Sequence, residues 1–176
     1  MSAPDLKAIF RAGFVRRWHT NPDLAHTVDR IDGHSARVAR ILLAVHPSPS
    51  LELIRTALIH DDGESATGDV SATFKRSMPG ILRVELAAQE SGHLIDLWGY
   101  SDPMPDCDTG CDAQWLKFAD RLDAYMWAAH HAPHVLNGDG WPEALEWLFD
   151  MAETLGCTGA LRSAVACDER EGEVAL

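Results

Sequence analysis

An adjacent histidine and aspartate, His60 and Asp61, end an apolar run of the sequence and are the residues best suited to metal chemistry. His34 lies upstream and Asp120 lies downstream, so the chain offers two imidazoles and two carboxylates. A borderline-hard divalent cation accepts these ligand types in an open catalytic site. Because a buried charge is costly unless it is paired or bound to a metal, the pattern predicts a metal-dependent hydrolase.

Asp120 has an alternative role, because an acidic residue on an apolar helical stripe also suits a salt bridge. Leaving such a carboxylate unpaired would cost on the order of several kcal/mol. Arg121, or an arginine of another helix, would provide that salt bridge, and Asp123, one turn along, is the competing ligand. With His34 and the His60-Asp61 doublet supplying the rest of a ligand set, we predict that Asp120 completes it.

The composition limits the classes of partner. The chain has 176 residues, of which 46% are hydrophobic, which suits one domain with its own core. Its net charge of -12 disfavours a nucleic acid polymer, although a metal and a few local cations would still admit a small polyphosphate. No apolar run has the length of a membrane span and no signal core opens the chain, so we expect a cytoplasmic protein without a membrane partner.

The spacing of apolar residues predicts an all-α domain over residues 1–176, without the alternation typical of strands. Pro4 and Asp5 open the first predicted helix, Asp32 caps the second, and Ser50 caps the third. His34 then lies on the second helix, the His60-Asp61 doublet ends the third, and Asp120 lies on the fifth. We expect a loop over 99–112 and fraying from about residue 157. The predicted helices cover 4–14, 32–45, 51–61, 79–97, 113–131 and a segment that begins at 141.

Together these residues resemble the ligand set of the HD-domain phosphohydrolases, all-helical metalloenzymes named for a His…His-Asp…Asp pattern. The resemblance implies a single compact HD-domain helical bundle. The matching segments are Gly33-His34-Ser35, Ile59-His60-Asp61-Asp62-Gly63-Glu64 and Phe118-Ala119-Asp120-Arg121-Leu122.

The closer likeness is to the bacterial 5'-deoxynucleotidases and the short phage dATP triphosphohydrolases of the same branch, and the compact length is more similar to the phage enzymes. The matches run from Arg17 to about Tyr125. The chain departs from the branch at Gly33, where a glutamate is common, and at 71–73, where a Pro-Thr-Pro turn is common. The second departure alters the wall of the nucleoside pocket, so base preference does not transfer. The further matching motifs are Arg17-Trp18, Thr67-Gly68-Asp69 and Lys75.

The resemblance implies a divalent metal held by His34, His60, Asp61 and Asp120. We expect Co²⁺, Mn²⁺ or Zn²⁺, with Mg²⁺ able to accompany a triphosphate. Four protein ligands leave an octahedral ion about two positions for a water and a phosphate oxygen. Glu64 follows Asp61 by three residues, so in a continuing helix it would face the same side and could orient or deprotonate the water. Its alternative is an ordinary surface position.

Four more residues complete the expected site. Asp69 would protonate the leaving 5'-oxygen or position the sugar, as its match in the family is thought to do, or it would serve only as a cap after Gly68. Arg17 and Lys75 would hold phosphate oxygens. Trp18 offers a flat face to a base, with a core position as the alternative.

These expectations combine into the hydrolysis of a deoxynucleoside 5'-triphosphate, with dATP-like substrates first, to the deoxynucleoside and triphosphate. One alternative is a 5'-deoxynucleotidase that acts on deoxynucleoside monophosphates. Others are a nucleotide-sensing module without catalysis and a purely structural helical protein. The expected partner is a small-molecule deoxynucleotide, and self-association into a homo-oligomer is expected by analogy.

Overall fold

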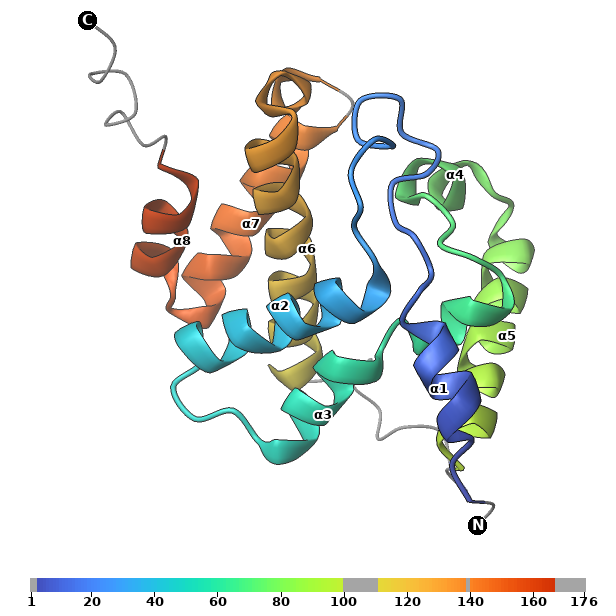
Figure 1. Ribbon diagram of the computed structural model, residues 1–176. Coiled ribbons are helices and arrows are strands. Elements are labelled where there is room, and N and C mark those ends of the chain that lie inside the picture. The colour runs from blue at the N-terminus through green and yellow to red at the C-terminus, as the bar shows by residue number, and fades with distance from the viewer. Residues whose placement is uncertain (1–2, 100–110, 139, 167–176) are drawn as a thin grey trace, which may run out of the picture.

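Helices make up the architecture in the computed structural model, which describes residues 3–99, 111–138 and 140–166 (Figure 1). Within these ranges the only β-type pairing is an isolated bridge between Arg16 and Arg30, so the all-α prediction is confirmed. The α-helices are α1 (Leu6–Ala12), α2 (Ile31–Val45), α3 (Leu51–Ile59), α4 (Ala72–Ser77), α5 (Gly80–Trp98), α6 (Cys111–His131), α7 (Trp141–Leu155) and α8 (Thr158–Val165), with 3-10 helices η1 (Asp62–Ala66) and η2 (Pro133–Asn137).

Side-chain caps begin two of the helices where the sequence predicts them. The carboxylate of Asp5 accepts hydrogen bonds from the backbone N–H groups of Lys7 and Ala8, both at 3.0 Å. The hydroxyl of Ser50 accepts from the N–H of Leu53 at 3.0 Å. Each cap satisfies amide groups that have no partner within the first turn of a helix.

The predicted cap at Asp32 is wrong. Helix α2 begins one residue earlier, at Ile31, and its N-cap is Arg30, which makes no side-chain capping bond. Asp32 instead lies in the first turn, where its charge is favourable to the helix dipole and its Oδ1 accepts from the N–H of Gly33 at 2.7 Å.

Two helices lie where the sequence predicts none. Helix α4 has no buried residue, so it carries no apolar stripe to reveal it. The segment after Gly156, for which we expect fraying, forms α8 and buries Leu161 fully. The central part of the predicted 99–112 loop, residues 100–110, lies outside the described residues.

The main core lies between α2, α3, α6, α7 and α8, and it fixes the directions of α2, α3 and α6 relative to one another. Figure 1 shows α7 and α8 on one side of this core, and α1, α4 and α5 on the other side of the molecule. Helix α5 packs mainly on η1, directly after the end of α3. The fully buried large apolar side chains of the core are Val38, Leu42, Leu53, Phe118, Leu148 and Leu161.

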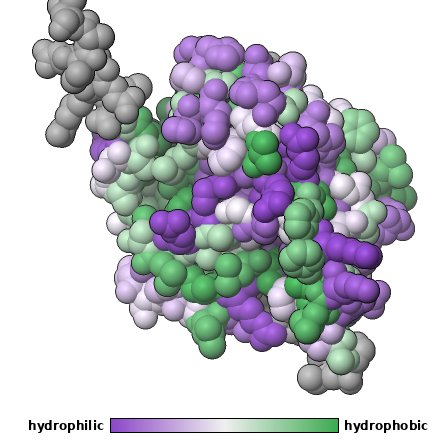
Figure 2. Space-filling model, viewed as in Figure 1, coloured by the Kyte–Doolittle hydropathy of each residue, from purple (hydrophilic) through white to green (hydrophobic). Residues whose placement is uncertain are grey.

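The surface mixes polar and apolar side chains on the face drawn in Figure 2. None of the described helices has both the length and the apolar character needed to cross a membrane. Large hydrophobic side chains that are strongly exposed include Leu6, Phe10, Leu51, Ile81 and Val84.

Candidate metal centre

His34 is the most deeply buried residue of the candidate site, with no exposed surface, in the first turns of α2. Its two ring nitrogens have different surroundings. Nδ1 lies 2.7 Å from Oδ2 of Asp123 on α6. Nε2 lies 3.1 Å from Oδ1 of Asp120 and 3.3 Å from Oδ2 of Asp61. The sequence leaves Asp120 and Asp123 as competing ligands. Helix α6 places both beside His34, with Asp120 near Nε2 and Asp123 near Nδ1.

His60 follows the last residue of α3 and serves as its C-cap. Its Nδ1 lies 2.9 Å from the carbonyl oxygen of Ala57, which can only accept, so Nδ1 donates this bond. The ring centroid of His60 lies 5.3 Å from that of His34, and its Nε2 lies 3.4 Å from Oδ1 of Asp61. The end of α3 thus places a second imidazole beside the first.

The Nε2 atoms of both histidines are buried and have no hydrogen-bond partner in the part of the chain that the structure describes. The oxygens near Nε2 of His34 are within ion-pair distance but do not form a hydrogen bond of adequate geometry with it. Buried polar nitrogens are costly to leave without a partner. With Nδ1 as the donor in each ring, the neutral form of each histidine carries a lone pair on Nε2, which is the form that binds a metal.

His34, His60 and Asp61 form a group that can hold a metal ion, because their ligand atoms all lie within 4.8 Å of one another. Asp120 is outside this group although its Oδ1 approaches Nε2 of His34. Its side chain is 39% exposed, so it lies at the solvent side of His34. The structure thus brings three of the four predicted ligands together and places the fourth beside them.

The electrostatics of the centre favour positive charge. Burial by itself lowers the pKa of His34, but the carboxylates of Asp120, Asp123 and Asp61 outweigh it and raise this pKa to about 10. Burial by itself raises the pKa of Asp61, and the charges of His60, His34 and Arg17 hold it well below its ordinary value. Carboxylates that stabilise a proton on a ring nitrogen would also stabilise a cation in its place.

Glu64 lies in η1 and is only 9% exposed. Its Oε1 lies 3.2 Å from Nζ of Lys75, which also approaches Oε1 of Glu90 at 3.6 Å. Burial and the negative charge of Asp61 raise the pKa of Glu64 to about 8, against the opposing effect of Lys75. A carboxyl group with a pKa in this range can take up or release a proton near neutral pH.

Arg17 and Trp18 lie in the segment between α1 and α2. Atom NH2 of Arg17 lies 4.0 Å from Oδ1 of Asp120, so the guanidinium group borders the metal centre. Trp18 has a φ of 63°, an uncommon conformation for a residue with a side chain, and its ring centroid lies 6.1 Å from that of Trp141. The backbone N–H of Trp18 donates to Oδ2 of Asp69 at 3.3 Å. The structure therefore brings together the predicted substrate-binding pair and the predicted acid.

Two neighbours of the centre are missed by the sequence reasoning, the buried Asp29 and the half-buried Arg37. Arg37 follows His34 by three residues, so helical spacing could have placed it on the same face. Asp29 lies in an irregular segment, and no spacing rule would have identified it.

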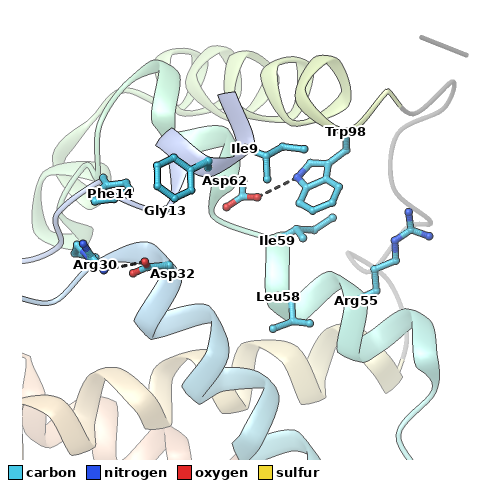
Figure 3. A pocket seen from close by; sticks show the side chains of 11 residues that line it. Ile9, Gly13, Phe14, Arg30, Asp32, Arg55, Leu58, Ile59, Asp62 and Trp98 are labelled. Atoms are coloured by element: carbon cyan, nitrogen blue, oxygen red, sulfur yellow. Dashed lines mark hydrogen bonds and ion pairs between the residues drawn. The ribbon is translucent and has the colours of Figure 1, made fainter. Parts of the chain in front are cut away.

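A cavity of about 540 Å³ lies elsewhere, between α1, α3 and the end of α5. Figure 3 shows Asp62 in this cavity, joined to Trp98 by a hydrogen bond from Nε1 of the indole at 3.0 Å. None of the three candidate metal ligands, His34, His60 and Asp61, lines it. The candidate metal centre, where buried ring nitrogens and carboxylates meet, is therefore separate from this mainly apolar cavity.

No protein-family model, curated protein or solved structure matches the chain, so no family assignment follows from these comparisons.

Proposed function

We propose that the protein is a metal-dependent phosphohydrolase of the HD-domain type. Its substrate in this proposal is a deoxynucleoside 5'-triphosphate, dATP-like, and its products are the deoxynucleoside and inorganic triphosphate. The observation that carries the proposal is the pair of buried Nε2 atoms of His34 and His60, neither of which has a hydrogen-bond partner among the described residues, beside the carboxylate of Asp61. The phosphohydrolase chemistry and the nucleotide come from the sequence motifs, which these positions support.

His34, His60 and Asp61 would hold the cation, and Asp120 would join them as the fourth ligand. A bound divalent cation supplies Lewis acidity, which makes a water more acidic and polarises the phosphoryl group under attack. The native metal is proposed to be Co²⁺, Mn²⁺ or Zn²⁺, because these ions accept a mixture of imidazole and carboxylate ligands.

Glu64 and Asp69 are the proposed proton carriers. Glu64 would accept the proton of the water that attacks the α-phosphorus, since it is buried near Asp61 and its raised pKa makes its ionised form a stronger base than an ordinary carboxylate. The oxygen of that water joins the triphosphate product, and the bond between the α-phosphorus and the 5'-oxygen breaks. Asp69 would deliver a proton to the departing 5'-oxygen, which yields the free deoxynucleoside.

Arg17, Lys75 and Trp18 are the proposed substrate contacts. Arg17 borders Asp120, and Lys75 lies beside Glu64, so each of these two proposed site carboxylates has a positive charge next to it. A planar guanidinium binds two phosphate oxygens at once, whereas an ammonium acts as a point charge. Trp18, close to Trp141, would offer its ring to the base.

Product analysis tests the proposal. The purified protein is treated with EDTA, restored with Co²⁺, Mn²⁺ or Zn²⁺, and incubated separately with dATP and dAMP. Deoxyadenosine together with inorganic triphosphate from dATP is the expected result, and it depends on the added metal. Orthophosphate from dAMP without turnover of dATP would indicate a 5'-deoxynucleotidase instead. Tight nucleotide binding with no product would indicate a sensor, and activity that survives complete chelation would contradict the metal-dependent class.

Cytoplasmic location and homo-oligomeric assembly stay predictions.

A further inference from the structure

Two buried aspartates and two arginines form a charged network behind His34. Asp29 has no exposed surface and Asp123 is 3% exposed. Arg37 bridges them: its Nε donates to Oδ1 of Asp123 at 2.6 Å, and its NH2 donates to Oδ1 of Asp29 at 2.8 Å. Atom NH1 of Arg17 approaches both carboxylates, at 3.3 Å for Asp29 and 3.4 Å for Asp123. Burial of two carboxylates at this depth is tolerated because both are paired with guanidinium groups.

Asp123 is the member of this network that touches His34, a proposed metal ligand. Its carboxylate is paired with the guanidinium group of Arg37, whose Nε and NH2 donate to its two oxygens at 2.6 and 3.1 Å. An ionised carboxylate only accepts hydrogen bonds, so Nδ1 of His34 is the donor in the 2.7 Å contact. This distance is at the short end for N–H···O bonds and is typical of charge-assisted ones.

We propose that Asp123, held in place by Arg37, is a positioning residue that fixes the ring orientation and the tautomer of His34. With its proton kept on Nδ1, the neutral imidazole carries its lone pair on Nε2, which lies on the side of Asp61 and Asp120. Without an anionic acceptor at Nδ1, the ring is free to change tautomer or to rotate, and both changes weaken metal binding. The inference rests on the proposed metal centre and is independent of the proposed substrate.

Asp29 provides a matched control within the same network. It is as deeply buried as Asp123 and shares Arg37 and Arg17 with it. Its carboxylate also accepts a hydrogen bond from Nε1 of Trp18 at 3.0 Å, and within the described residues it forms no hydrogen bond or ion pair with His34. If the network serves only to stabilise the fold, then neutralising either aspartate will have the same consequences.

The test compares Asp123→Asn with Asp29→Asn in the full chain. Co²⁺ affinity is measured by calorimetric titration, the ligand field of Co²⁺ by visible absorption, and the fold by thermal unfolding in EDTA. In EDTA, where no metal is bound, both variants are expected to unfold at a lower temperature than the wild type. Asp123→Asn is expected to bind Co²⁺ about 10 to 100 times more weakly with an altered spectrum. Asp29→Asn is expected to keep wild-type affinity within about threefold and an unchanged spectrum.

Equal Co²⁺ affinity and an unchanged spectrum in Asp123→Asn would overturn the proposal, as would equal losses in both variants. If Asp123→Asn does not fold, then Arg37→Lys is used in its place. Lysine keeps the charge but lacks the fork that reaches both carboxylates, so Co²⁺ affinity is again expected to fall, by a smaller factor. A wild-type chain that binds no Co²⁺ would overturn the positioning role and the metal centre together. Normal Co²⁺ binding without phosphohydrolysis would contradict only the proposed function.

Discussion

Two adjacent carboxylates, Asp61 and Asp62, have opposite electrostatic environments. Asp61 belongs to the metal-binding group, and the charges around it hold its pKa well below the ordinary value. Asp62 accepts a hydrogen bond from Trp98 in the separate cavity, and burial raises its pKa to about 6. One peptide bond therefore separates a group suited to hold a cation from a group that burial tends to neutralise.

Neutralising these two aspartates is expected to have different effects on metal binding. Asp61→Asn removes a charged ligand, so we expect Mn²⁺ affinity to fall by about 100-fold or more, since buried charge pairs account for several kcal/mol. Asp62→Asn keeps an acceptor for the indole N–H and removes no ligand, so we expect affinity within about threefold of the wild type. Calorimetric titration with Mn²⁺ checks both, and comparable losses in the two variants would contradict the assignment of Asp61.

Glu64 and Glu90 both pair with Lys75, but Glu64 is the more buried of the two, and the charge of Asp61 helps to raise its pKa. We expect Glu64→Gln to lower kcat for dATP by about 100-fold or more, the usual effect of losing a proton carrier. Metal affinity is expected to stay unchanged, because Glu64 is not in the metal-binding group. Glu90→Gln is the matched variant, and steady-state kinetics that show an equal fall in kcat would refute the proposed role of Glu64.

The sequence predicts which residues form most of the candidate site, but tertiary packing decides how their side chains are arranged. Residue types and motif spacing indicate His34, His60 and Asp61, which the structure brings into one group. Asp120 and Asp123 are one turn apart on the same helix, so sequence alone does not say which side of the imidazole each approaches. That choice depends on how α6 packs against α2, which is set by the core between them.

At the scale of elements, the close contact between η1 and α5 determines where the residues after the doublet lie. A Cβ added at Gly63 would lie 2.2 Å from the carbonyl oxygen of Glu90, a distance that real side chains do not adopt. Only glycine lets η1 approach the backbone of α5 this closely. The contact holds Glu64 and Glu90 near Lys75.

Replacing Gly63 by alanine is therefore expected to force η1 away from α5. We expect a loss of about 2 kcal/mol or more in the free energy of unfolding, the usual range for overpacking against backbone. Gly92→Ala is the matched control, because its added Cβ meets nothing within 4 Å, and alanine is the better helix former by about 1 kcal/mol. Urea denaturation measures both changes. Equal stability of Gly63→Ala and the wild type would show that the contact between η1 and α5 tolerates a Cβ at position 63.

Element prediction succeeds where a strong local signal exists. The caps at Asp5 and Ser50 and the apolar spacing of the long helices locate most of the fold. Helix α4 buries nothing, so it has no apolar stripe that stands out in the sequence. Helix α8 is amphipathic, but it has only eight residues and no side-chain cap, so it lacks the start signal that marks α1 and α3. The cap assigned to Asp32 fails because the chain enters α2 through an extended Arg30 instead.

At the scale of the whole molecule, a bound cation would connect three elements that are distant in sequence. Its ligands come from α2, from the end of α3 and, through Asp120, from α6. Ligand binding that requires the folded arrangement stabilises the fold by about 2.7 kcal/mol when the free ligand is at 100 times its Kd. The metal centre should therefore contribute to global stability as well as to chemistry.

We accordingly expect Mn²⁺ at about 100 times its Kd to raise Tm by about 5–10 °C over the protein in EDTA, given a chain of this size. The shift is expected to disappear in Asp61→Asn, which has lost a charged ligand. Differential scanning calorimetry with and without metal provides the measurement. A wild-type Tm that does not respond to saturating Mn²⁺ would argue against a cation that bridges these helices.

The central claim is that His34, His60, Asp61 and Asp120 converge on a single cation, and anomalous diffraction from crystals grown with Mn²⁺ or Co²⁺ tests it most directly. The account predicts one strong anomalous peak, about 2.0–2.3 Å from Nε2 of both histidines and from an oxygen of both aspartates. A fully occupied metal bound elsewhere in the chain, with these four side chains unliganded, would contradict it.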